Sequence, residues 1–140
     1  QVTSQPRSGS IGGAVLLNFD SLSSGAIVRG IVLRNADVSG AGNGTGYNQG
    51  AKAAGPGYHA IFRLIAFSGT NITMKIQESS DDAGADPYAD VTGLTSGALT
   101  AVGVVGVSVT VAMEAWRRVV ISGTFTTATI LVTGGVQTGT

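Results

Sequence analysis

The chain has 140 residues with eight basic and eight acidic side chains, so its formal net charge is zero, and it contains no cysteine. This length fits one domain of ordinary size, the charge balance disfavours nucleic acid and anionic membranes as partners, and the lack of cysteine excludes disulfides and thiolate metal sites. Only 11% of the residues are charged, against roughly 25% in an ordinary soluble domain, so we expect the chain to cover much of its surface by forming a homo-oligomer.

Helix signals are nearly absent, because β-branched residues, Gly and Thr dominate and apolar residues do not recur at helical spacing. Short alternating runs between turn residues predict an all-β fold, an antiparallel β-sandwich of jelly-roll or immunoglobulin-like type. The most apolar stretch, residues 99–113, is too short to span a membrane. The candidate strands, in chain order, are residues 13–19, 26–35, 59–67, 72–79, 98–105, 108–113, 116–122 and 128–134, with a short one near 88–92.

The N-terminal part of the chain is less regular than the rest. Residues 35–57 are dense in Gly and Asn and lack apolar periodicity, which predicts a long loop or linker. We therefore expect residues 1–57 to form an N-terminal arm with short strands and a Gly-rich linker, and residues 58–140 to form the β-sandwich core, within one domain overall. Gln1 begins the numbering without an initiator Met, so it is either a native start, a processed end or part of a longer chain.

The tripeptide Ser-Gly-Thr occurs twice, at residues 68–70 and 122–124. Gly69 and Gly123 permit the positive φ of tight turns, so each copy predicts a hairpin that joins the strands on either side of it. Both alternating registers of residues 59–67 are mostly apolar, which predicts a strand that is central or covered on both faces. Arg63 in that strand is then a structural residue or an interface contact.

Four aspartates lie within ten residues after the first Ser-Gly-Thr copy: Asp81, Asp82, Asp86 and Asp90. Calcium prefers such hard oxygen ligands, so these four aspartates are candidate calcium ligands, although their spacing does not match an EF-hand. The favoured alternative is a solvated loop whose aspartates accept hydrogen bonds from their own backbone. We expect no other cofactor.

No enzyme is predicted. His59 is the only histidine, and no nucleophile motif such as G-x-S-x-G is present, so we expect no catalytic residues. The glycines of residues 40–46 neither follow a parallel strand nor open a helix, which argues against a dinucleotide loop.

A second candidate function is sugar binding. Trp116, Tyr88 and Arg118 are the candidate ligand-binding residues, because aromatic rings stack on sugars and a guanidinium supplies hydrogen bonds. Alternation directs Arg117 and Arg118 to opposite faces, so only one of them can face a given ligand. The alternative use of Trp116 is to anchor the core or its rim. The aromatic residues available to such a platform are Trp116, Tyr47, Tyr58 and Tyr88.

Several motifs taken together resemble a known module. They are FSGT at residues 67–70, MKIQESSDD at 74–82, ADVTG at 89–93 and RRVVISGTFTTA at 117–128. This set is similar to a β-sandwich module of tail and virion structural proteins of tailed bacteriophages (siphoviruses), and part of it also resembles carbohydrate-binding jelly rolls.

The resemblance implies a structural protein of the virion, an extracellular particle assembled in the host cytoplasm, with itself and other virion proteins as partners. The expected role is a self-assembling tail subunit, in the tube or decorating it. A capsid decoration protein and a module that binds a host surface glycan are the alternatives. The sequence does not identify the residues that carry assembly.

Overall fold

The computed structural model describes residues 27–28 and 30–138. Those residues form strands and no helix, and every strand pairing is antiparallel, which confirms the predicted all-β fold. No membrane-spanning helix is therefore found in the described part of the chain. The expected strand at residues 13–19 lies outside the described residues. The strands are β1 (Ile27–Val28), β2 (Ile31–Val38), β3 (Gly42–Asn43), β4 (Tyr47–Asn48), β5 (Tyr58–Ser79), β6 (Ala89–Leu99), β7 (Gly103–Val109) and β8 (Trp116–Thr138).

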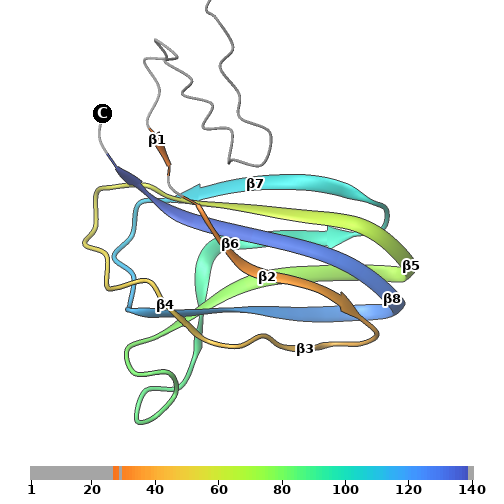
Figure 1. The fold of residues 1–140 in the computed structure, drawn as a ribbon, viewed down its shortest axis with the longest axis horizontal. Helices are drawn as coiled ribbons and strands as arrows, with labels where there is room; N and C mark the ends of the chain where they lie inside the picture. The colour runs from red at the N-terminus through yellow and green to blue at the C-terminus, as the bar shows by residue number, and fades with distance from the viewer. Residues whose placement is uncertain (1–26, 29, 139–140) are drawn as a thin grey trace, which may run out of the picture.

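Two long strands organise the fold. β5 has 22 residues, β8 has 23, and the two pair with each other along nearly their whole length. Both strands fold over at the same place, so that the sheet becomes two layers (Figure 1). We call the layer with β7, the first half of β5, the second half of β8, β1 and β2 the upper sheet. The lower sheet contains β6, the second half of β5, the first half of β8, β3 and β4.

The prediction that the two Ser-Gly-Thr segments form hairpins is wrong. Each segment lies inside one continuous strand, and the two meet where the sheet folds over, with Gly69 opposite Phe125 and Ile72 opposite Gly123. Gly123 has a φ of 123°, and a Cβ at this position would lie 2.5 Å from the carbonyl oxygen of Asn71. Glycine is required because the two backbones approach too closely for a side chain. The residues that permit a hairpin are thus the residues that permit a fold in a continuing strand.

The segment at residues 35–57, predicted as a long loop or linker, is largely irregular, but it pairs with β8 at three places. β2 continues to Val38 along the second half of β8, while β3 and β4 pair with its first half. Between these strands the Gly44 N–H donates to the Val119 carbonyl at 2.7 Å, and the Gln49 N–H donates to the Ala115 carbonyl at 2.9 Å. Because backbone groups make these contacts, no apolar periodicity is needed to hold the segment in place.

Strand boundaries also differ between β6 and β8. The apolar run at residues 98–105 includes the turn between β6 and β7, and β7 ends at Val109 rather than continuing to Met113. Met113 forms an isolated bridge with Lys52. The short strand expected near residues 88–92 is the beginning of β6.

The core lies between the two sheets and is built by alternation along the long strands. From β5, alternate side chains such as Phe62, Leu64, Met74 and Ile76 are completely or almost completely buried. Burial of each such side chain stabilises the fold by roughly 1.5–3 kcal/mol. The other buried apolar residues are Tyr58, Ala60, Ile72, Val91, Leu94, Met113, Val119, Ile121, Ala128, Ile130 and Val132.

Candidate functional site

The outer face of the upper sheet carries large exposed apolar side chains. Ile61 is 48% exposed, Ile65 50%, Val104 56% and Val32 53%. Burial of their inward-facing neighbours leaves these side chains directed away from the core, as strand alternation requires. The first half of β5, residues 58–67, and β7 together contain no acidic residue. The one arginine or lysine in these two segments is Arg63.

The strand register places these residues side by side. Ile61 lies opposite Gly106 on β7 and Thr133 on β8, and Thr133 lies opposite Val32 on β2. A Cβ at Gly106 would meet no other atom within 4 Å, so the surface beside Ile61 is open. A groove of about 470 Å³ runs here, lined by Gly30, His59, Ile61, Gly106, Ser108 and Thr133 among others.

The expected central position of residues 59–67 is correct within the sheet, since this part of β5 pairs with β7 on one side and with β8 on the other. Arg63 lies between Val104 and Leu131 in the register and is exposed. No described segment covers the outer face of Ile61 or Ile65. The second apolar register of this strand therefore faces outward, where it is available for contact.

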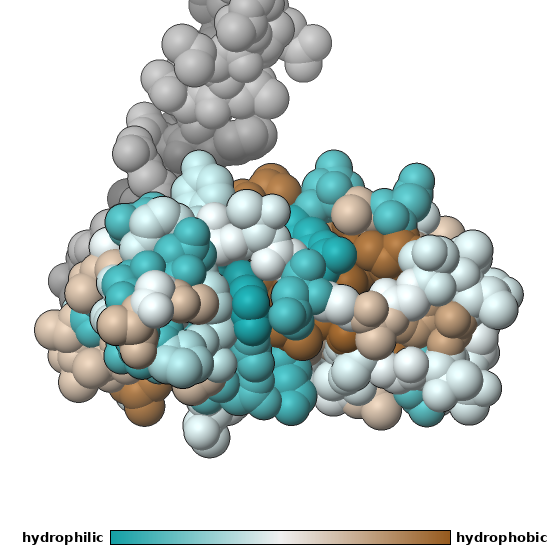
Figure 2. Space-filling model, turned by 90° about the horizontal axis from the view of Figure 1, so that it is seen from below, coloured by the Kyte–Doolittle hydropathy of each residue, from teal (hydrophilic) through white to brown (hydrophobic). Residues whose placement is uncertain are grey.

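The outer face of the lower sheet is polar by contrast. Asp90 on β6 accepts hydrogen bonds from Lys75 Nζ and Gln77 Nε2, both at 2.8 Å. The Arg118 guanidinium donates to Gln77 Oε1 through Nε at 3.0 Å and Nη2 at 2.8 Å. Figure 2 shows the molecule from below, where a hydrophilic band crosses the middle of the surface.

The same network extends to the candidate ligand residues. Arg118 lies over the ring of Tyr88, 4.2 Å from its centre, and the Tyr88 hydroxyl donates to Asp82 Oδ1 at 2.6 Å. Burial and the bond to Asp82 raise the pKa of Tyr88 to about 12. One face of the Tyr88 ring is therefore occupied by a guanidinium, so that stacking on a ligand would have to use the other face or displace Arg118.

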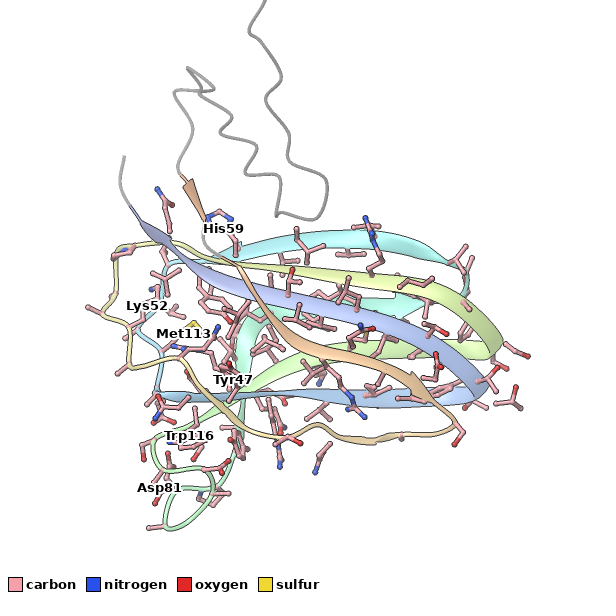
Figure 3. The ribbon with its side chains drawn as sticks, in the orientation of Figure 1. Tyr47, Lys52, His59, Asp81, Met113 and Trp116 are labelled. Atoms are coloured by element: carbon pink, nitrogen blue, oxygen red, sulfur yellow. The ribbon has the colours of Figure 1, made fainter. Side chains whose placement is uncertain are left out.

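The aromatic residues of the predicted platform do not all lie at the surface. Tyr58 is completely buried in the core, Tyr47 is about half exposed, and Tyr88 is tied to Arg118. Trp116 is partly buried at the start of β8, opposite Ser79 and Asn48. Figure 3 shows Trp116 below Tyr47, near the acidic loop that contains Asp81.

The aspartates of this loop organise its backbone. Asp81 accepts hydrogen bonds from the backbone N–H groups of Ala85, Asp86 and Gly84, at 2.6, 3.1 and 3.0 Å, and these bonds lower its pKa. Asp86 accepts the Ser80 N–H at 2.8 Å, which lowers the pKa of Asp86 as well. The loop is thus a solvated loop whose aspartates accept hydrogen bonds from their own backbone, which is the predicted alternative to calcium binding.

The four predicted calcium ligands do not converge. Asp81 and Asp86 bind loop amides, Asp82 binds Tyr88, and Asp90 binds Lys75 and Gln77. The hydrogen bonds from Lys75 and Gln77 lower the pKa of Asp90. Within residues 27–28 and 30–138, no group of three or more His, Cys, Asp or Glu side chains is close enough to hold a metal ion.

Two buried cations at the end of the sandwich opposite the fold-over were not predicted. Arg117 is completely buried and donates through Nη1 to Gly50 O at 3.1 Å and Gln49 Oε1 at 3.3 Å. Lys52 is 6% exposed, and its Nζ donates to the carbonyls of Ala53 and Val111 at 2.9 and 2.6 Å (Figure 3). Alternation in WRRVVI does signal that one of its two arginines points inward, but nothing in the sequence around Lys52 signals burial.

Comparisons with protein families, with curated proteins and with solved structures find no match to this chain.

Proposed function

We propose that this protein is a non-enzymatic structural subunit that assembles into many identical copies by burying the outer face of its upper sheet. The observation that carries the proposal is the row of half-exposed apolar side chains around Ile61 and Val104. Apolar side chains exposed together on one face, here with Arg63 as the one cation among them, mark interaction sites, because their exposure to water is unfavourable. Each of these half-exposed side chains contributes about 1 kcal/mol when a neighbouring subunit covers it.

The particle in which it assembles is, in this proposal, the virion of a tailed bacteriophage, as a tail subunit or a surface decoration. The motif resemblance supports this assignment. The motifs that carry it lie at the fold-over, in the aspartate loop after β5 and at the opening of β6. The low proportion of charged residues also suits a protein that is surrounded by copies of itself.

Analytical ultracentrifugation over a range of protein concentrations tests the self-association. The unmodified protein is expected to form oligomers, and Ile61→Asp is expected to shift it toward monomer by burying an unpaired charge in the interface. Thr92→Asp, which changes an exposed residue of β6, is the matched control and leaves association unchanged. Circular dichroism verifies that both variants remain folded. An unmodified protein that stays monomeric at high concentration overturns the proposal.

Electron microscopy of the assembled protein tests the particle. Rings, tubes or particle-bound knobs support a virion role, whereas irregular aggregates contradict it. The glycan-binding alternative is tested separately on a glycan array. We expect no bound glycan, and a ligand that is lost in Trp116→Ala would favour the host-attachment role instead.

A further inference from the structure

The groove beside Ile61 lies next to the point where the described chain begins. Gly30, which precedes β2, is one of its lining residues, and His59 lies at the same end of the upper sheet (Figure 3). Twenty-six residues precede Ile27 in the sequence. The groove is therefore within reach of the N-terminal segment of the chain.

That N-terminal segment contains one strongly apolar run, GAVLLNF at residues 13–19, which carries no charge. Its alternation fits an extended strand that is apolar on at least one side. Such a strand matches the groove in chemistry, since the floor is formed by Ile61, Gly106 and Thr133 and has no acidic residue. Gly106 provides the space that a side chain of the strand requires.

The direction of β1 favours a neighbouring subunit over the same subunit. Ile27 pairs antiparallel with Thr138, near the end of β8, so a chain that continues β1 backwards runs off the end of the upper sheet. Residues 20–26 span at most about 25 Å when extended. Docking on the chain's own face requires a reversal within these seven residues, whereas docking on a copy that lies beyond this end of the sheet does not.

We propose that residues 13–19 of one copy bind in the groove beside Ile61 on the upper sheet of a neighbouring copy. This inference rests on the proposed self-association and names the segment that carries it. Exchange of identical segments between subunits is a common route to closed or extended assemblies. Apolar contact with the sheet face provides the stabilisation, and the chain N-terminal to β1 connects the two copies.

Disulfide trapping tests the inference in the full-length protein, because the chain contains no cysteine. Chains with Leu16→Cys or Leu17→Cys are purified separately and mixed with chains that carry Gly106→Cys. Both arm positions are used because alternate residues of a strand face opposite sides. Gly106 is open, so its substitution is sterically tolerated. Thr92→Cys on the lower sheet replaces Gly106→Cys in the control mixture.

After mild oxidation, we expect at least about tenfold more disulfide between unlike chains with Gly106→Cys than with Thr92→Cys, because docking raises the local thiol concentration to about millimolar. A chain that carries Leu16→Cys or Leu17→Cys together with Gly106→Cys tests the alternative, in which the segment binds the groove of its own subunit. If it forms its disulfide within one chain even when diluted among unmodified copies, the segment binds its own subunit and the inference is wrong. Equal yields in test and control mixtures also overturn it.

Ultracentrifugation of the unmodified protein separates the two proposals. Oligomers without trapping show that the segment assignment is wrong while self-association stands. A monomer contradicts both.

Discussion

The guanidinium of Arg117 lies over the ring of Tyr58, 5.1 Å from its centre, and both side chains are completely buried. Two of the guanidinium nitrogens, Nε and Nη2, have no hydrogen-bond partner in the described residues. Burial lowers the pKa of Arg117, because the charged form loses its hydration there. This cation is therefore held by packing, by its contact with the ring and by the two hydrogen bonds of Nη1, and its contribution to stability can be tested.

We expect Arg117→Met to leave the free energy of unfolding within about 1 kcal/mol of the unmodified protein, since an apolar side chain of similar volume avoids the cost of burying a charge. Arg117→Ala is expected to lower it by about 3 kcal/mol through the cavity that it creates. Urea unfolding measures both. Equal destabilisation by the two variants would show that the guanidinium itself is required.

We expect ionisation of Tyr58 to lower the stability of the protein at alkaline pH. Its burial raises its pKa to about 12, against an ordinary value of about 10, and its hydroxyl donates to Gln49 Oε1 at 2.7 Å. Above pH 10 the unfolded chain releases this proton while the folded chain retains it. The stabilisation is thus complete below pH 10 and is lost as the pH rises through 12.

Thermal unfolding between pH 8 and pH 12 measures this loss, and Tyr58→Phe is expected to make the decline less steep. Tyr88 has a pKa raised to about the same value, so Tyr88→Phe and the double variant separate the two contributions. An alkaline profile that Tyr58→Phe leaves unchanged would contradict the assignment to Tyr58.

The fold-over at Gly123 predicts a strong requirement for glycine. Gly123→Ala places a methyl group against the Asn71 carbonyl at a φ of 123°, so we expect a loss of about 2–3 kcal/mol. Gly103→Ala is the matched control, because a Cβ at Gly103 meets nothing within 4 Å. Urea unfolding of both variants measures the difference. Similar free energies for the two would mean that the strands can separate at the fold-over at little cost.

We expect protonation of Asp81 to lower the stability of the protein in acid. The hydrogen bonds from the backbone N–H groups of Ala85, Asp86 and Gly84 lower its pKa, so its contribution is present above the ordinary value of about 4 and is lost as the pH falls through the folded value. Asp81→Asn should therefore reduce the decrease in melting temperature between pH 5 and pH 2. Asp82→Asn changes a carboxylate of the same loop that accepts the Tyr88 hydroxyl, and serves as the control. An acid profile that is unchanged in Asp81→Asn would contradict this role.

Calcium at millimolar concentration is expected to change the melting temperature by less than about 1 °C, because the loop carboxylates bind protein donors instead of converging on one point. Differential scanning fluorimetry with and without a chelator measures this. A calcium-dependent increase that disappears in Asp86→Asn would restore the calcium hypothesis.

Much of the fold could be predicted from local pattern. Runs rich in apolar and β-branched residues at 59–67, 72–79, 116–122 and 128–134 located the four halves of β5 and β8, since such runs between turn residues are typical of strands. Their continuity could not be predicted. It depends on pairing between β5 and β8, which are far apart in the sequence, and a glycine flanked by hydroxyl residues is equally suited to a hairpin.

The site shows a similar division. The sequence offers the four aspartates as calcium ligands and Arg118 and Tyr88 as ligand-binding residues, yet it does not reveal that these side chains bind one another or the backbone. The sequence also shows the apolar residues of β5 that face outward. Whether such a face is covered depends on the strands and segments packed around it, and that information lies outside any short stretch of sequence.

The pairing of Ile27 with Thr138 brings the beginning and the end of the described fold to the same edge. A domain whose two ends lie close together can be inserted into another protein with little distortion of that protein. The fold is accordingly suited to transplantation into an exposed loop of an unrelated protein, where it would display its surface as an inserted module.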